Sequence, residues 1–163
     1  MRIVREILRD FLGKQRRADA RASRRGTGDA RGTGDARGPV RTTYAPRADG
    51  RPDPGEVCWA WVPYEEDPGQ GKDRPVLIIG REGGQLLALP VTSKDHDRDE
   101  AQEARAGRFW MDIGSGAWDP RRRPSEVRLN RVVRLDPAAV RREGAALDRG
   151  VFDKVIAEMR RRR

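Results

Sequence analysis

Two apolar runs that flank a glycine pair restrict the folds open to this chain. The first, GKDRPVLIIG, spans residues 71–80, and the second, LLALPVTSK, spans residues 86–94. Short apolar runs bounded by turn residues are typical of strands, and Gly83 and Gly84 suit a two-residue hairpin turn. We therefore predict an antiparallel hairpin in which paired residue numbers sum to about 166 or 167.

Further apolar segments of the same kind occur from Pro54 onward, on both sides of the hairpin. Residues 56–63 and 126–135 have the composition of strands, and the final segment places apolar residues on one helical face. Asp148 is the expected N-cap of that helix. Because strands and helices do not alternate, we predict a mainly β (α+β) fold: a small, strongly bent barrel of roughly five or six strands with a C-terminal helix.

Residues 1–53 differ from the rest of the chain in amino-acid composition and are predicted to be a basic N-terminal extension of the domain 54–163. Apolar positions at helical spacing predict an amphipathic helix over about residues 2–12. The hexapeptide RGTGDA then occurs at residues 25–30 and again at 31–36, a composition that predicts a flexible linker. The sequence leaves open whether the helix covers this protein, a second copy, a membrane surface or a partner.

Charge and cysteine content indicate where in the cell the protein is located more than what reaction it performs. Residues 1–53 hold 14 Lys or Arg against 7 Asp or Glu, and residues 160–163 are all Arg, so the formal charge of +9 belongs to the two ends. Basic tails attract polyanions without specifying a site. Cys58 is the single cysteine, which excludes an internal disulfide and favours the cytoplasm. No apolar run approaches the roughly 20 residues of a membrane helix, so no membrane is expected.

The hairpin register would place Arg74 opposite Thr92 or Ser93 at the polar ends of both strands. Directly opposed residues have Cβ atoms roughly 4.5–5.5 Å apart. A guanidinium offers a planar fork of donors and the hydroxyls add donors beside it, a combination that suits a phosphate. The alternative is that Arg74 pairs with Asp73 or Asp95 and that Thr92 is an ordinary strand residue.

Aromatic and acidic residues outside the hairpin are less specific. Trp118 lies in a loop beside Arg121–Arg123 and is predicted to stack on a base or contact a partner, or to plug the end of the barrel. His96 sits among aspartates, where a solvated side chain is expected. Those aspartates lack the glycine and the closing glutamate of a calcium loop, so no metal is assigned.

Several blocks, in order, resemble the MazF/PemK family of toxin endoribonucleases from toxin-antitoxin pairs. They are PGEVCWAWVPYEED, GKDRPVLII, LALPVTSK and SEVRLNRVVRLD, and the resemblance runs from Pro54 to about Met159. It implies an SH3-like barrel, a homodimer, an acidic antitoxin as partner, and cleavage of single-stranded RNA without a metal or other cofactor. The predicted products carry 2',3'-cyclic phosphate and 5'-hydroxyl ends.

The resemblance matches Arg74, Thr92, Ser93 and Arg128 to residues of the family's motifs. Arg74, Thr92 and Ser93 are the predicted catalytic residues, and the predicted RNA-binding residues are Lys72, Lys94, Trp118, Arg128 and Asn130. Asn130 stands where some members have an aspartate, and the acid that often precedes the RP block is absent, so the proton acceptor is unassigned. Two alternatives therefore stay open: a non-catalytic member that binds RNA or a protein, and an interaction protein that acts through its Arg-rich ends.

Overall fold

The computed structural model of the chain describes residues 34–93, 100–140 and 144–163. The predicted helix near residues 2–12, most of the RGTGDA repeats, Lys94 and His96 lie outside the described residues. The described parts form one sheet, a short helix, a 3-10 turn and a C-terminal helix. In chain order these are β1 Gly34–Asp35, β2 Glu56–Pro63, β3 Gly71–Glu82, β4 Gln85–Ser93, α2 Glu100–Arg105, β5 Trp110–Gly114, β6 Ser125–Arg128, β7 Val133–Leu135, the 3-10 turn Pro137–Ala139, β8 Ala145–Ala146 and α3 Arg149–Arg161.

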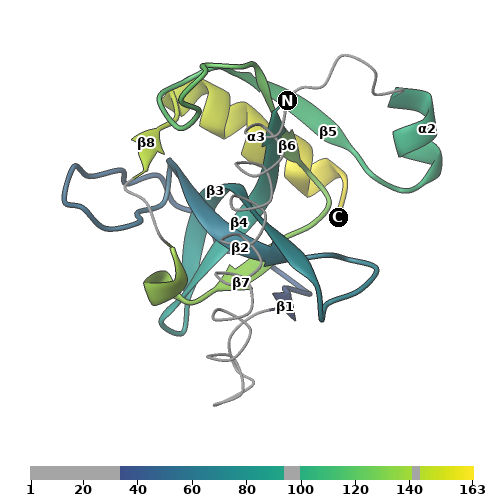
Figure 1. Cartoon of the computed structure of the whole chain (residues 1–163), viewed down its shortest axis with the longest axis horizontal. Helices are drawn as coiled ribbons and strands as arrows, with labels where there is room; N and C mark the ends of the chain where they lie inside the picture. The colour runs from purple at the N-terminus through teal and green to yellow at the C-terminus, as the bar shows by residue number, and fades with distance from the viewer. Residues whose placement is uncertain (1–33, 94–99, 141–143) are drawn as a thin grey trace, which may run out of the picture. The chain divides into compact units, whose positions relative to one another are not determined.

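The eight strands pair antiparallel in the order β1-β7-β4-β3-β2-β8, and the β5–β6 hairpin joins this path through β4. Figure 1 shows the bent sheet with α3 lying across one side of it. The mainly β fold with a C-terminal helix is confirmed. The path of described strands does not return on itself, so the sheet is open where the sequence suggested a barrel.

The predicted hairpin is β3 and β4. Gly83 and Gly84 connect the strands with φ angles of 55° and 81°, which L side chains rarely adopt and which a tight hairpin turn requires. Val76 pairs with Pro90 and Glu82 with Gln85, in agreement with the register predicted from the sequence. A bulge between Ile78 and Gly80 shifts the register by one residue.

Both faces of the central strands are buried, which explains their nearly unbroken apolar runs. Leu77, Leu89 and Phe152 belong to a large cluster that includes the inner face of α3. Cys58 and Ile78 belong to a second cluster on the other face of the sheet. Side chains alternate between the two faces of a strand, so each strand must be apolar at successive positions.

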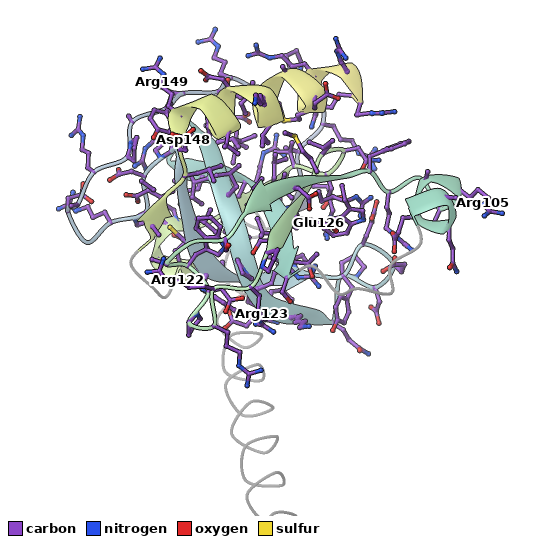
Figure 2. The ribbon with its side chains drawn as sticks, turned by 90° about the horizontal axis from the view of Figure 1, so that it is seen from above. Arg105, Arg122, Arg123, Glu126, Asp148 and Arg149 are labelled. Atoms are coloured by element: carbon purple, nitrogen blue, oxygen red, sulfur yellow. The ribbon has the colours of Figure 1, made fainter. Side chains whose placement is uncertain are left out.

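The helix α3 begins where the sequence predicted. The Asp148 side chain accepts a hydrogen bond from the Val151 N–H at 3.2 Å and caps the first turn. The inner face of α3 buries Phe152, Ile156 and Met159 against the sheet. Figure 2 shows Asp148 and Arg149 at the start of this helix. No helix in the described ranges is long and apolar enough to cross a membrane.

Residues 34–53, which the sequence placed in the N-terminal extension, pack on the same compact unit. The strand β1 pairs with β7, and Ala36 is buried. Tyr44 donates a hydrogen bond to the Leu147 carbonyl at 2.7 Å, and its ring lies 5.1 Å from the ring of Phe152. The compact unit therefore includes residues 34–53 as well as the segment that follows them.

Candidate functional site: a cationic pocket at the open ends of β3, β4 and β6

A pocket of about 290 Å³ lies where β3, β4, β5 and β6 meet the loop that follows β2. Two strands of the hairpin supply part of its wall, and β6 supplies another. Its positively charged lining residues are Lys72, Arg74, Arg108, Arg128 and Arg131. Guanidinium and ammonium groups gathered around one concavity make it suited to an anionic ligand.

The structure places Arg74 and Thr92, predicted as neighbours from the hairpin register, on the wall of this one pocket. Both side chains are half-buried. They are not partners in the strand ladder: Arg74 pairs with Ala60 on β2, and Thr92 pairs with Glu126 on β6. β3 supplies the guanidinium and β4 supplies the hydroxyl.

Ser93 does not share this position. It pairs with Ser125 on β6 and is not among the residues that line the pocket. Successive residues of a strand point to opposite faces, so Thr92 and Ser93 cannot both project into one concavity from regular strand backbone. The hydroxyl pair predicted from the sequence therefore contributes Thr92 to the pocket wall, and Lys72 and Arg128 of the predicted set join it there.

Arg128 is a buried cation of the pocket that neighbouring side chains hold in place. Its side chain is 7% exposed, and its Nε donates a 2.8 Å hydrogen bond to Oδ1 of Asn130. The same Oδ1 accepts from the Phe109 N–H at 3.3 Å, and Nδ2 of Asn130 donates to the carbonyl of Gly107. Asn130 thus uses an acceptor and a donor together, a combination that an ionised aspartate does not have. The residue is an anchor for Arg128 and for the turn before β5.

Three glutamates, which the sequence analysis did not single out, line the same pocket. Glu65 pairs with Arg128 at 2.9 Å, and Glu103 pairs with Nε of Arg108. Glu66 lies 3.8 Å from Arg108. The hydrogen bond that Arg108 donates to Glu103 raises the pKa of Arg108 above its ordinary value. An anion that enters the pocket therefore competes with carboxylates already placed beside the cations.

Arg131 joins the pocket wall to the N-terminal segment. It is buried, donates to the Pro63 carbonyl at 2.7 Å, and pairs with Asp35 of β1 at 3.2 Å. The carbonyl that it holds belongs to the last residue of β2, immediately before Tyr64 of the pocket. Arg131 was not predicted as a site residue, because the sequence carries no signal that this one arginine is turned inward.

The structure buries Trp118, for which the sequence left base stacking, partner contact and a hydrophobic plug open. It is only 6% exposed, its indole N–H donates to the Ser125 hydroxyl at 3.1 Å, and its carbonyl accepts from Trp59 at 2.8 Å. A ring buried in this way offers no face to a base, so the alternative, a hydrophobic plug, describes it. Figure 2 shows Arg122 and Arg123 on the same loop.

Asp119 fixes the shape of that loop. Its carboxylate accepts hydrogen bonds from the Arg121 N–H at 2.9 Å and from Nε of Arg123 at 2.8 Å. Burial by itself would raise the pKa of Asp119, but these hydrogen bonds hold it below its ordinary value. Within the described ranges, no group of three His, Cys, Asp or Glu side chains is placed to hold a metal ion.

The fold and the pocket together define a class of protein: a small antiparallel β domain with arginines and a hydroxyl around a pocket whose chemistry suits an anion such as a phosphodiester. Residues 53–161 match the family model of the PemK-like, MazF-like toxins of type II toxin-antitoxin systems, and the chain belongs to this family. Members of this family are endoribonucleases.

A similar solved structure is the crystal structure of MazE-MazF (Form-II) from Deinococcus radiodurans. The two chains are 23% identical over 69% of this chain and 91% of that chain, with a TM-score of 0.40. No curated protein sequence matches the chain.

Proposed function

We propose that this protein is a metal-independent endoribonuclease that cleaves single-stranded RNA at short sequences. The observation that carries the proposal is the placement of Arg74, Thr92 and Arg128 around one cationic pocket. The family to which the chain belongs supports the class of reaction. RNA contains its own nucleophile, the 2'-hydroxyl, so the protein needs to supply alignment, charge stabilisation and proton transfer.

In the proposed reaction the 2'-oxygen attacks the adjacent phosphorus while the bond from phosphorus to the 5'-oxygen breaks. Arg74 stabilises the charge that develops on the phosphoryl oxygens and donates a hydrogen bond to the leaving 5'-oxygen. The 2'-hydroxyl gives its proton to a base, and the 5'-oxygen takes up a proton from water. Thr92 donates a hydrogen bond to a non-bridging oxygen, and Ser93 supports the same strand end. The products carry a 2',3'-cyclic phosphate and a 5'-hydroxyl.

Flanking phosphates are held by Lys72, Lys94 and Arg128 in this proposal. Arg128 comes to the site already oriented by Asn130, which reduces the entropy lost when a phosphate binds. Glu65 must exchange its place beside Arg128 with the incoming phosphate. The carboxylates of the pocket also provide candidates for the proton acceptor that the sequence left unassigned, with Glu65 nearest to the proposed phosphate ligand Arg128.

The proposed partners follow from the family. A toxin of a type II system is neutralised by an antitoxin, and an acidic antitoxin chain that occupies the cationic pocket would exclude RNA. We also propose a homodimer, on the strength of the resemblance, and a cytoplasmic location, on the strength of the single cysteine.

The test is cleavage of a long mixed-sequence RNA by purified protein in excess EDTA, with the fragment ends mapped. Arg74→Ala should abolish cleavage without abolishing RNA binding. Arg105→Ala is the matched control, because it removes the same charge from an exposed residue of α2 that does not line the pocket and that projects away from the sheet (Figure 2). Discrete cuts with cyclic-phosphate ends from the wild type and the control alone would support the proposal. Intact RNA from folded, RNA-binding wild type would instead favour a non-catalytic binding protein.

A further inference from the structure

Tyr64 is the large apolar side chain that the described part of the chain leaves most open to solvent, with 38% of its surface exposed. A single exposed aromatic is ordinary on a protein surface. The position of Tyr64 is less ordinary, because it lines the cationic pocket together with Arg74, Thr92 and Arg128. An apolar ring beside cations presents two kinds of binding surface at one place.

The backbone beneath Tyr64 is held on both sides. The carbonyl of Pro63 accepts the 2.7 Å hydrogen bond from buried Arg131, and the Tyr64 N–H donates to the Gln70 carbonyl at 2.8 Å. Gln70 in turn donates to the Asp67 carbonyl at 3.0 Å, which closes the loop. A ring on a fixed base loses little conformational entropy when a ligand covers it.

The two tryptophans near β6, Trp110 and Trp118, are less suited than Tyr64 to bind a flat ligand. Trp110 lines the same pocket, but the Arg128 guanidinium lies over its ring at 6.0 Å, and its indole N–H donates to Glu103 at 3.4 Å. Trp118 is buried. Tyr64 is therefore the aromatic ring of the described pocket that is best placed to receive a planar group.

We propose that Tyr64 is the platform on which one base of a single-stranded RNA stacks while the neighbouring phosphodiester lies among Arg74 and Arg128. The proposal rests on the proposed function and adds a nucleobase subsite to its phosphate site. Stacking on an aromatic ring is tolerant of base identity because every base has a π face. Tyr64 then takes the role that the sequence had suggested for Trp118.

The experiment distinguishes the effect of the aromatic ring on RNA binding from that of its volume. It also distinguishes binding of the bases from binding of the phosphates. Tyr64→Phe keeps the ring, Tyr64→Leu keeps apolar volume without a ring, and Tyr64→Ala removes both; thermal unfolding verifies that each variant is folded. Binding is measured by fluorescence anisotropy with a short 2'-O-methyl RNA of random sequence, which cannot be cleaved, and with an abasic strand of equal length and charge.

The wild type and Tyr64→Phe should bind the RNA more tightly than the abasic strand. Tyr64→Leu and Tyr64→Ala should lose about 5- to 150-fold in affinity for the RNA, equivalent to roughly 1–3 kcal/mol at 1.4 kcal/mol per tenfold, and little for the abasic strand. A Tyr64→Leu protein that binds like the wild type, or variants that lose affinity equally for both strands, would overturn the stacking role. Failure of the wild type to bind either strand would overturn the proposed function with it.

Discussion

Replacement of Asn130 tests whether Arg128 must be oriented to hold RNA. Asn130→Ala removes the acceptor for Nε of Arg128, the acceptor for the Phe109 N–H and the donor to the Gly107 carbonyl. Asn130→Asp keeps the acceptor, loses the donor, and sets a carboxylate oxygen against that carbonyl. Because the geometry makes Asn130 an anchor, both variants should be less active than the wild type.

The size of the effect follows from these contacts. A hydrogen bond to a charged group contributes about 1.5–3 kcal/mol and a neutral one about 0.5–1.5 kcal/mol. Asn130 is half-buried, so water replaces part of what Asn130→Ala removes, and we expect a loss of about 2–3 kcal/mol in the free energy of unfolding. Affinity for RNA should fall by about tenfold, because Arg128 then pays the ordering entropy itself.

The assay is binding of a non-cleavable 2'-O-methyl RNA over a range of salt concentrations, beside cleavage rates for the same variants. Arg128→Ala should reduce the slope of log affinity against log salt by about 0.7, the value for one phosphate contact on a single strand. Asn130→Ala should lower affinity with a smaller change of slope, since the charge is still present. Wild-type affinity in a less stable Asn130→Ala protein would refute the anchoring role. Faster cleavage by Asn130→Asp would show that a carboxylate at this position serves as the base.

Three further predictions concern the pocket, the N-terminal segment and the loop before β6. Glu65→Gln should tighten binding of the same RNA by up to about fivefold, because a phosphate no longer displaces a carboxylate from Arg128; weaker binding would mean that Glu65 holds that arginine in place. Gly80→Ala should lower the free energy of unfolding by about 1–3 kcal/mol in a denaturant titration, because its Cβ would lie 2.3 Å from the Arg41 carbonyl oxygen; an unchanged value would show that this segment does not lie against β3. Asp119 has a pKa held below its ordinary value by hydrogen bonds despite burial, so its contribution to stability is present above the ordinary pKa of 3.8 and is lost as pH falls through the folded value. Denaturant titrations at several pH values should therefore show Asp119→Asn less stable at neutral pH and less sensitive to acid than the wild type.

The hairpin is a part of this fold that can be predicted from residues close together in the sequence. Gly83 and Gly84 adopt the positive φ angles that a two-residue turn needs, so the turn sets the register of β3 and β4 as far as the bulge between Ile78 and Gly80. Two buried faces explain the unbroken apolar runs. That residues 34–53 pack on the sheet was not predictable, because their contacts join backbone groups far apart in the chain, as between Thr43 and Ile79.

In the candidate site, too, the positions of residues within one hairpin could be predicted, whereas contacts between distant segments could not. Arg74 and Thr92 could be placed together because both belong to the hairpin. In contrast, Arg128 pairs with Glu65 from the loop after β2, and its neighbour Asn130 is held by the backbone of the turn before β5. Such partners depend on the pairing of β4 with β6, which no turn specifies.

The sequence could not decide between the roles open to Trp118 for a related reason. A tryptophan in a loop rich in Gly, Pro and Arg has no periodicity that would reveal a buried ring, and its burial depends on hydrogen bonds to Ser125 and Trp59. Tyr64, in contrast, follows a strand end and precedes two glutamates in a turn, a context that usually indicates an exposed residue. The local pattern thus indicates that Tyr64 is exposed, but only the meeting of β3, β4 and β6 shows that it faces a cationic pocket. Exposure becomes a hypothesis about base binding once that position is known.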